Sequence, residues 1–373
     1  MTGNGLVIVA LSGGVDSAVS ALLLRDAGYD VQCLHMSNWE DDGYCEAAGD
    51  FQDARNIAQQ LDLPLHRVNF ADEYREQVFA HFLTEYEAGR TPNPDVLCNR
   101  HIKFGEMRRY AHRLGADWVA TGHYAQLRRI DGRIHLLKGR DPGKDQSYFL
   151  HAVEEANFAD VLFPLGEMTK REVRDRARDA GLVVAEKKDS TGICFIGERP
   201  FTEFLSQYLP PNPGQIKEPG GQVLGEHQGL AYYTLGQRQG LHIGGLASYG
   251  PEPWYVADKD FVHNDLIVVQ GADHPLLYQN WLTADTVRWI NGAPEKWPEG
   301  IALRCHAKTR YRQGDQACTV TRRDEDRLEV WFEQPQRAVT PGQYVVIYRG
   351  NHCLGGATIH AAGMQTTPLE AAV

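Results

Sequence analysis

The stretch LVIVALSGGVDSAVSALLL, residues 6–24, decides the fold expected for this chain. Residues 6–11 form a short apolar run that predicts a buried strand, and residues 16–27 carry apolar side chains at helical spacing. Ser12, Gly13 and Gly14 lie between the two and predict a tight turn, because glycine adopts backbone angles that other residues avoid. The helix that follows presents free N–H groups and a partial positive charge at its start, which suit a phosphate group.

Strand and helix patterns alternate through the first half of the chain, which predicts a parallel sheet with helices on both faces. Further strands are expected at residues 31–36, 65–70 and 117–121, and further helices at residues 47–61 and 73–87. Within residues 127–138, Asp131 and Gly132 separate two alternating segments, which indicates a β-hairpin. Thr169 and Glu172 form a capping-box pattern that predicts the start of another helix.

The character of the sequence changes after Leu209. The segment PPNPGQIKEPGG, residues 210–221, is rich in proline and glycine, as linkers and domain edges are. Residues 282–360 show short alternating strand patterns separated by turns, which predict a small β-barrel or sandwich. We therefore expect an α/β domain with a parallel sheet over residues 1–209, a small mixed central domain over residues 210–277, a C-terminal β-barrel over residues 278–363 and a tail over residues 364–373.

Bulk composition narrows the class of protein. No apolar run approaches the roughly 20 residues that a membrane span needs, and the first residues lack the basic region and the small-residue cleavage site of a signal peptide. The seven cysteines form no C-x-x-C pair or cysteine–histidine cluster of the kind that binds zinc. We expect a cytoplasmic protein with reduced thiols, no membrane association and no fixed protein metal site. The formal net charge of −11 argues mildly against nucleic acid binding, although the distribution of charge counts for more than its sum.

The turn at residues 12–14 has further features of a phosphate-binding loop. Ser12 and Ser17 add hydroxyl donors to the backbone N–H groups, and together these groups suit a pyrophosphate. The loop is not a Walker A motif, because it lacks a Gly-Lys-Ser/Thr sequence. Phosphate charge must therefore be met by the backbone, by Mg²⁺ and by side chains from elsewhere. A bare Ser-Gly-Gly turn is usually only a capped turn, whereas the full string SGGVDS between a strand and a helix is far more specific.

Two cysteines lie in segments with unusual neighbours. In GRTPNPDVLCNRHIKFG, residues 89–105, the prolines predict an extended, rigid loop that meets the next helix at Cys98. In KKDSTGICFIGERPF, residues 187–201, Cys194 lies among small residues and is flanked by cations. A helix start and nearby cations lower the pKa of a thiol and favour the reactive thiolate. For Cys98 taken alone, a buried packing residue is the better interpretation, and for Cys194 taken alone it is an equally good one.

Several long strings of the sequence resemble those of one family. SGGVDS, PNPDVLCN, GKDQSYFL and KKDSTGICFIGER in the first part, and GEHQGLAYYTLGQRQGL, PWYV, KTRYRQ and VTPGQ further on, are similar to strings of the tRNA-specific 2-thiouridylases, which are PP-loop ATP pyrophosphatases. The resemblance runs from about Leu6 to Gly356. It implies a PP-loop catalytic domain with a Rossmann-like parallel sheet, followed by a small mixed central domain and a C-terminal β-barrel.

The activity implied by the resemblance is that of a tRNA-uridine 2-sulfurtransferase. Such an enzyme uses ATP with Mg²⁺ to adenylate the 2-oxo oxygen of the wobble uridine of tRNA, because AMP leaves more readily than a carbonyl oxygen. Sulfur from a cysteine persulfide then replaces that oxygen, giving 2-thiouridine, AMP and pyrophosphate. The partners implied are tRNA and, as the persulfide sulfur donor, a sulfur-carrier protein or a cysteine desulfurase.

The resemblance also implies roles for individual residues. Cys194 carries the persulfide, Cys98 is the nucleophile that completes the exchange, and a Cys98–Cys194 disulfide results. Asp95 is implied as a general base or as a group that recognises the target base. Core packing is the competing interpretation for Met36, which the resemblance assigns to ATP. The residues implied to bind ATP are Ala10, Leu11, Ser12, Gly13, Gly14, Val15, Asp16, Ser17, Met36 and Gly122. Those implied to contact the target nucleotide and tRNA are Asn93, Pro94, Asp95, Lys144, Asp145 and Gln146.

A run of basic residues in the expected barrel is a candidate RNA surface. It consists of Arg304, Lys308, Arg310, Arg312, Arg322 and Arg323. Alternating cations on a strand can meet phosphates along one face, and Tyr311 within the run can stack on a base. A solvated strand face is the usual interpretation of such a run, but the local excess of cations stands out in an acidic protein. A second basic patch spans residues 170–178.

Two other functions stay open at this point. The first keeps the fold and replaces tRNA with a small molecule, as in a PP-loop ATP pyrophosphatase of the argininosuccinate or NAD synthetase kind, which would need neither Cys98 nor Cys194. The second is a tRNA-binding protein with a decayed nucleotide site, against which the intact SGGVDS string argues.

Overall fold

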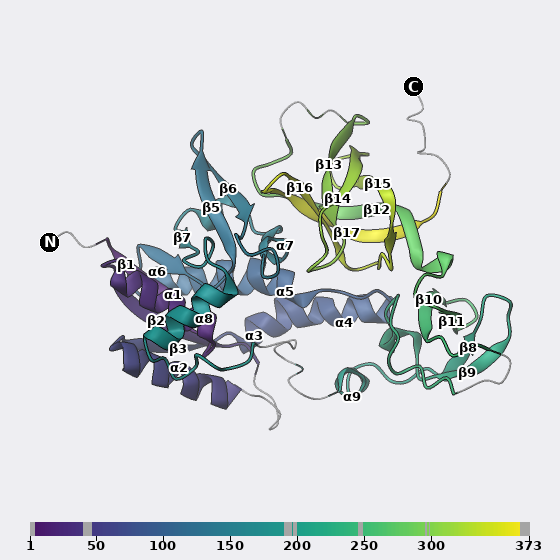
Figure 1. The fold of residues 1–373 in the computed structure, drawn as a ribbon, viewed down its shortest axis with the longest axis horizontal. Helices are drawn as coiled ribbons and strands as arrows, with labels where there is room; N and C mark the ends of the chain where they lie inside the picture. Colours follow the sequence, from purple (N-terminus) through teal and green to yellow (C-terminus); the bar gives the residue numbers. More distant parts are fainter. Residues whose placement is uncertain are drawn as a thin grey trace.

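The computed structural model of the protein describes residues 4–39, 47–189, 196, 200–244, 249–294, 297 and 299–365. Figure 1 shows three parts in chain order. The first, coloured purple to teal, surrounds a parallel sheet; the second, in green, is a small sheet; the third, green to yellow, is a β-barrel. Within the described ranges, no helix is both long and apolar enough to cross a membrane.

The N-terminal sheet has five parallel strands in the order β3-β2-β1-β4-β7. The strands are β1 (Leu6–Ala10), β2 (Asp30–Ser37), β3 (Leu65–Asn69), β4 (Trp118–Ala120) and β7 (Val161–Leu162). The order reverses between β1 and β4. Sheets of this kind bind ligands outside the carboxyl ends of the strands at such a reversal.

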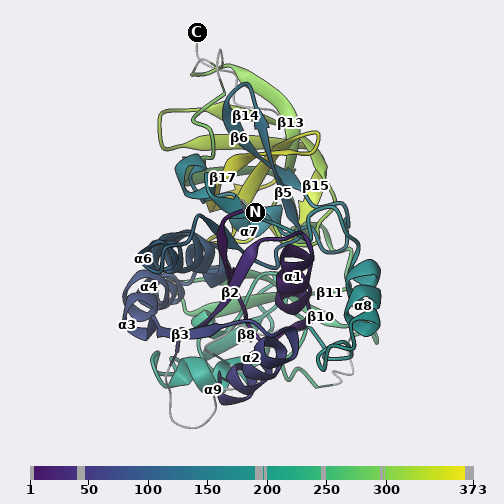
Figure 2. The same cartoon turned by 90° about the vertical axis from the view of Figure 1, so that its left-hand side faces the viewer.

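Helices cover both faces of this sheet (Figure 2). Val7 and Val9 of β1 pack into one core with one group of helices, and Ile8 packs into a second core on the opposite face. The first group is α1 (Val15–Asp26), α2 (Ala47–Leu61) and α8 (Lys170–Asp179). The second is α3 (Ala71–Tyr74), α4 (Ala80–Glu87), α5 (Pro94–Leu97), and α6 (Arg108–Arg113), with π-helical turns η1 (Arg75–Phe79) and η2 (Cys98–Met107) between them.

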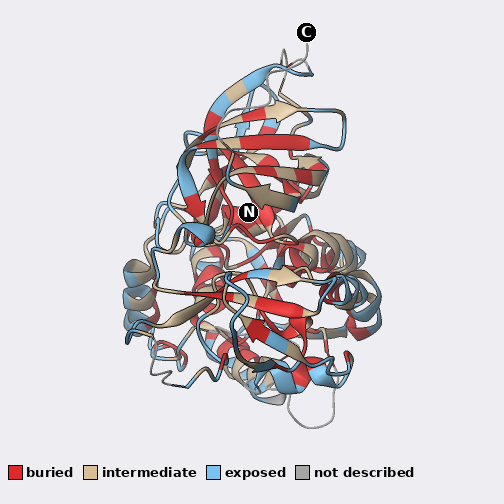
Figure 3. Cartoon of the chain, turned by 90° about the vertical axis from the view of Figure 1, so that its right-hand side faces the viewer, coloured by how far each residue is buried: buried red, intermediate tan, exposed pale blue. Residues whose placement is uncertain are grey.

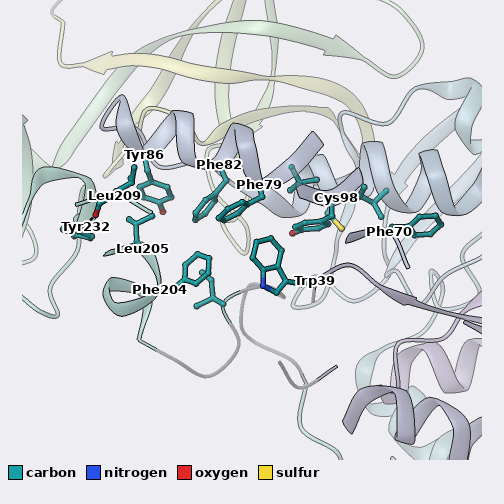
Figure 4. Close-up of a cluster of buried hydrophobic side chains, with 14 of the residues drawn as sticks. Trp39, Phe70, Phe79, Phe82, Tyr86, Cys98, Phe204, Leu205, Leu209 and Tyr232 are labelled. Carbon is teal, nitrogen blue, oxygen red and sulfur yellow. Dashed lines mark hydrogen bonds between the residues drawn. The ribbon is translucent and has the colours of Figure 1, made fainter. Parts of the chain in front are cut away.

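The second core extends far beyond the sheet. Figure 4 shows its aromatic side chains in a row along η1 and α4, from Phe70 and Cys98 at one end to Leu209 and Tyr232 at the other. The helix α9 (Phe201–Ser206) adds Phe204, whose ring centroid lies 6.0 Å from that of Phe79. The same apolar cluster therefore joins the first part of the chain to the second.

A hairpin of the first part joins the sheet of the third. It consists of β5 (Ala125–Ile130) and β6 (Arg133–Lys138), and its turn residues Asp131 and Gly132 both have positive φ, as the sequence predicts. The β6 strand then pairs antiparallel with a barrel strand, through His352 opposite Leu137. The hairpin pattern did not predict this second pairing, because strand edges carry no partner signal in the local sequence.

The second part is a sheet of four strands in the order β10-β11-β8-β9. They are β8 (Gly214–Lys217), β9 (Val223–His227), β10 (Trp254–Asp260) and β11 (Asp265–Gln270). Short helices elsewhere in the described chain are α7 (Ser147–Leu150) and the 3₁₀ turns η3 (Glu155–Phe158), η4 (Leu230–Tyr232) and η5 (Pro275–Leu277).

The third part is a closed antiparallel barrel in the order β12-β15-β14-β13-β16-β17, with β17 pairing back to β12. Its strands are β12 (Tyr278–Trp289), β13 (Ala302–Lys308), β14 (Gln316–Arg322), β15 (Leu328–Arg337), β16 (Tyr344–Arg349) and β17 (His352–Gly363). Buried residues line the barrel strands in Figure 3, among them Leu282, Val320 and Val345. The predicted order of a Rossmann-like parallel-sheet domain, a small mixed domain and a β-barrel is confirmed.

Candidate active site

The phosphate loop follows β1 at the edge of the sheet where the strands end. Ala10 closes the strand, and the buried side chains of Leu11 and Val15 anchor the loop at both ends. Gly13 has a φ of +85°, and a Cβ there would lie 2.4 Å from the carbonyl oxygen of Asp50, so no other residue fits. Gly14 is the extended N-cap of α1 and offers no capping side chain, which leaves the helix start open to a ligand.

The two serines of the loop hold its shape. The Ser12 backbone N–H donates to Ser17 Oγ over 3.2 Å, and Ser17 Oγ donates to the Gly14 carbonyl over 3.0 Å. The two hydroxyl oxygens lie 3.2 Å apart. Ser12 is exposed whereas Ser17 is 4% exposed, so Ser12 is the better placed of the two to reach a ligand.

Asp16, in the first turn of α1, lies at the centre of an ion-pair network. Lys170 Nζ lies 2.8 Å from both of its carboxylate oxygens, and the Tyr124 hydroxyl donates to it over 2.7 Å. Lys170 also reaches Asp189 at 2.7 Å, and Lys144 reaches Asp189 at 2.6 Å. Burial works against ionisation of Asp189, but the hydrogen bonds from Lys144 and Lys170 lower the pKa of its carboxyl to about 2.

A further lysine lies on the other side of the loop. Lys187 Nζ donates to the Gly13 carbonyl over 3.3 Å and pairs with Asp50 at 2.8 Å and with Asp53 at 2.7 Å. Burial alone would lower the pKa of Lys187, but its bonds to the two carboxylates raise it, so the ammonium stays charged. Lys170 and Lys187 thus border the loop from segments more than 150 residues away in the chain, each paired with two carboxylates.

Neither lysine is predicted from the sequence to bind phosphate. Lys170 falls in the basic patch predicted to contact RNA, and Lys187 falls among the cations that flank Cys194. Most cations of that patch are paired: Arg174 with Asp189, Arg176 with Asp26, and Arg178 with Asp175 and Glu186. A local signal existed for Lys170, because the capping box at Thr169 and Glu172 fixes it in the first turn of α8. Its contact with Asp16 of α1 has no signal in the local sequence.

The loops after the neighbouring strands border the same edge. Gly122 follows β4, and a Cβ there would lie 3.0 Å from the backbone of Asp16 and Ser17, so glycine lets this loop meet the start of α1. Met36 lies near the end of β2, half-buried, opposite Val68 of β3. Its packing against the second core fits the core interpretation, and its contact with ATP stays a prediction.

The segment around Cys98 is helical where an extended loop was expected. Asn93 is the N-cap, with its side chain accepting from the Asp95 N–H over 3.2 Å, and the buried Pro94 is the first helical residue. Asparagine before proline is therefore a helix start here. Cys98 lies a full turn inside the helix, so the predicted position at a helix start was wrong. The helix start therefore gives no reason to expect a lowered pKa for this thiol.

Cys98 and Asp95 differ in exposure. The Cys98 side chain is 6% exposed and packs in the second core near Trp39 and Phe70 (Figure 4). Asp95 is open to solvent, yet the protein around it desolvates the carboxyl enough to raise its pKa, while the charge of Lys103 acts in the opposite direction. The raised pKa favours the protonated form of this carboxyl more than in an ordinary aspartate.

Cys194 lies outside the described residues, but the chain on both sides of it is held. Asp189 is fixed by Lys144, Lys170 and Arg174. Ile196 is 7% exposed and belongs to the same apolar cluster as Cys98. Phe204 packs on Phe79 in that cluster as well.

The segment GKDQ, residues 143–146, connects the ion pairs beside the phosphate loop to the barrel. Lys144 binds Asp189, and Gln146 Oε1 accepts from the Tyr124 N–H over 3.0 Å. Asp145 is 5% exposed; its carboxylate accepts from the N–H groups of Gly139 and Ser147 and faces Lys308 Nζ of β13 at 3.2 Å. Asp145 is therefore placed to hold the two parts of the chain together.

The predicted basic run divides into two groups. Lys308 is buried, Arg322 donates to the Trp297 carbonyl over 3.3 Å, and Arg323 pairs with Glu329. Arg304, Arg310 and Arg312 are exposed. Arg310, Tyr311 and Arg312 lie in the loop between β13 and β14, not on a strand face as predicted. The centroid of the Tyr311 ring lies 4.4 Å from that of Phe149, so this barrel loop meets the first part of the chain near Lys144 and Gln146.

Comparison with known proteins gives consistent matches along the chain. Residues 5–198 match the family described as tRNA methyl transferase HUP domain, residues 202–270 the tRNA methyl transferase PRC-barrel domain, and residues 279–359 the aminomethyltransferase beta-barrel domain. The chain is 58% identical over 356 residues to tRNA-specific 2-thiouridylase MnmA of Methylococcus capsulatus, with 95% of each chain covered. It is 57% identical over 360 residues to the protein of that name from Dichelobacter nodosus, with 95% of this chain and 94% of the relative covered.

Proposed function

The chain belongs to the tRNA-specific 2-thiouridylase family, and from this membership we propose that it is a tRNA-modifying transferase that uses ATP to convert a uridine of tRNA to 2-thiouridine. The observation that carries the proposal in the structure is the phosphate loop, whose open helix start is bordered by Lys170 and Lys187. A PP-loop pyrophosphatase acting on a small molecule is disfavoured, because the relatives cover nearly the whole chain, barrel included.

In the first step, we assign the triphosphate of ATP, bound with Mg²⁺ as substrate, to the loop. The N–H groups at the start of α1 and the Lys170 and Lys187 ammonium groups would bind its phosphates. Lys170 would then divide its charge between phosphate and the carboxylates of Asp16 and Asp189. The 2-oxo oxygen of the uridine attacks the α-phosphorus, pyrophosphate leaves, and the oxygen carries AMP.

In the second step, we assign sulfur transfer to the two cysteines. The terminal sulfur of a Cys194 persulfide attacks C2 of the uridine, and AMP leaves with the former 2-oxo oxygen. The Cys98 thiolate then attacks Cys194 Sγ, the bond between the two sulfurs of the persulfide breaks, and its electron pair stays on the sulfur attached to C2. The products are 2-thiouridine and a Cys98–Cys194 disulfide, which an external thiol must reduce before the next cycle. The burial of Ile196 in the cluster that holds Cys98 supports this pairing.

The base and the RNA are assigned to groups on either side of these cysteines. Asp95 is the proposed proton acceptor or base-recognition group, and its raised pKa suits a carboxyl that exchanges a proton during the reaction. The exposed Arg310 and Arg312, with Tyr311 and Lys144 nearby, form the proposed tRNA contact. We further propose a cytoplasmic location and, as sulfur donor, a sulfur-carrier protein or a cysteine desulfurase.

The proposal is tested by incubating unmodified tRNA with the protein, ATP, Mg²⁺ and a persulfide source, and by analysing the digested nucleosides by mass spectrometry. The expected product is 2-thiouridine at the wobble position, formed only when ATP is present. Release of AMP without thiolated nucleoside would point to a different acceptor, and absence of both products would refute the function.

A further inference from the structure

A cavity lies between the first part of the chain, which holds the phosphate loop and is called the catalytic part below, and the barrel. It is separate from the phosphate loop itself. Its volume is about 430 Å³, which lies within the range of small-ligand sites of roughly 300–1,000 Å³. Arg90, Arg100 and His151 line it from the catalytic part, and Asp285, Arg288 and Tyr344 line it from the barrel. Neither part forms the cavity alone.

Two half-buried arginines of this cavity, Arg100 and Arg288, have few polar partners among the described residues. Arg100 has one carboxylate near it in the described chain, that of Glu154, at a distance of 3.7 Å. Arg288 Nε is shielded from solvent and has no hydrogen-bond partner among the described residues. The Arg288 Nη1 donates to the carbonyl of Val287 over 3.5 Å, which is a long contact.

The acidic groups that line the cavity are already engaged. Glu85 accepts from Arg90 Nε over 2.6 Å. Asp285 accepts from the Thr286 hydroxyl over 3.2 Å and lies 3.4 Å from His360 Nδ1. His151 is fully buried, and this burial lowers its pKa to about 4, so it is neutral at pH 7. Three arginines and two carboxylates line the cavity, so with its histidines taken as neutral the lining carries a net charge of +1.

The two guanidinium groups also act on each other. Burial lowers the pKa of Arg100, and the positive charge of Arg288 lowers it further. Burial likewise lowers the pKa of the neighbouring His101, and the charges of Arg100 and Arg288 add to this effect. Like charges held together in a shielded space, with an unsatisfied donor beside them, are stabilised by an anion between them.

We propose that this interdomain cavity binds a phosphate group between Arg100 and Arg288. Guanidinium groups bind phosphate through paired N–H donors, which fits two arginines that face one cavity. The phosphate can come from the backbone of bound tRNA or from a free nucleotide such as AMP; both sources rest on the proposed function. Arg100 follows Cys98 by two residues on the same helix, so the two side chains point to different sides of it. The cavity is thus a site separate from the thiol.

The variants Arg100→Gln and Arg288→Gln test the proposal, with Arg349→Gln as the matched control. Arg349 is an exposed arginine at the end of β16 that does not line the cavity. Binding of inorganic phosphate and of AMP is measured by calorimetry, with a non-hydrolysable ATP analogue present to fill the phosphate loop. Binding of tRNA is measured separately at one fixed salt concentration.

Loss of a charged donor to phosphate should weaken binding about tenfold in each cavity variant and leave the control unchanged. A loss seen with tRNA alone identifies the source as an RNA phosphate, and a loss seen with AMP and inorganic phosphate identifies a free anion. The proposal is overturned if all three ligands bind both cavity variants as tightly as the wild type, or if the control loses as much affinity.

A second measurement tests the site if Arg100→Gln or Arg288→Gln folds poorly. Added phosphate should raise the melting temperature of the wild type and of Arg349→Gln, and should raise that of Arg288→Lys less, because lysine keeps the charge but loses the paired donors. Equal shifts in all three proteins would contradict the site. Failure of the proposed function has a different readout, the absence of 2-thiouridine from wild-type reactions.

Discussion

Replacement of Lys170 by methionine separates the phosphate role of α8 from an RNA role. The Lys170 ammonium makes two 2.8 Å contacts with Asp16 and one of 2.7 Å with Asp189, and the side chain is 12% exposed. Asp189 keeps Lys144 and Arg174, and Asp16 keeps the Tyr124 hydroxyl. We therefore expect the variant to remain folded, with a loss of roughly 1–2 kcal/mol of stability after allowance for solvent screening.

The effect on adenylation should be much larger. Removal of one donor that stabilises developing charge costs about 3–4 kcal/mol in the transition state, which corresponds to a loss of roughly 10²–10³-fold in rate. The assay is pyrophosphate release from ATP in the presence of tRNA, with binding of tRNA measured in parallel. Arg171→Met is the matched control, because Arg171 is exposed on the same helix next to Lys170.

The outcome distinguishes two assignments of the same residue. The phosphate assignment predicts slow pyrophosphate release and unchanged tRNA affinity for Lys170→Met, and normal behaviour for Arg171→Met. If Lys170→Met releases pyrophosphate within about threefold of the wild-type rate, the lysine is structural. If tRNA affinity falls instead, the basic patch of α8 binds RNA after all.

Three further predictions concern the loop, the barrel and a buried histidine. Asp16→Ala and Ser12→Ala should each strongly reduce AMP formation in a folded protein, and unchanged AMP formation in both would contradict the pyrophosphate assignment. Reversal of Arg310 and Arg312 to glutamate should weaken tRNA binding and reduce the slope of its salt dependence by about 2, with ATP binding unchanged; unaltered tRNA affinity at low salt would exclude this loop as the RNA contact. His151 has a pKa of about 4 in the folded protein against 6.5 for an ordinary histidine, so the unfolded state takes up the proton first as pH falls. The free energy of unfolding is therefore highest at neutral pH and decreases as pH falls through this interval. Between about pH 7 and about pH 5 the loss is about 2 kcal/mol, and denaturant unfolding of His151→Gln should show a correspondingly flatter pH dependence, whereas an unchanged dependence would mean that other groups carry it.

The parts of the fold that local patterns specify were predictable. The five residues of β1 and the fifteen of α2 follow from apolar runs and helical spacing. The turn at Asp131 and Gly132 and the capping box at Thr169 follow from the chemistry of individual residues. In each case the deciding interaction joins residues close together in the chain.

The parts that were missed depend on contacts between distant residues. Nothing near Lys170 in the sequence indicates that its ammonium faces Asp16, 154 residues earlier. Pairing of β6 with β17 joins strands of two different parts of the chain. At Asn93 and Pro94 the local signal was present but ambiguous, because the same pair can begin a helix or stiffen a loop. The assignments of ligand-binding and catalytic residues stay predictions, since each needs a substrate to test it.

The central claim is that two cysteines divide the sulfur chemistry between them, and labelled sulfur tests it most directly. Cys98→Ser and Cys194→Ser are each supplied with tRNA, ATP and a persulfide donor carrying labelled sulfur, and protein-bound label, adenylated tRNA and 2-thiouridine are measured. Both variants should adenylate tRNA, because that step uses no sulfur, and neither should form 2-thiouridine. Cys98→Ser should carry label on Cys194, whereas Cys194→Ser should carry none. Label on Cys194→Ser and not on Cys98→Ser would reverse the two roles, and thiolated tRNA from both variants would refute the two-thiol mechanism.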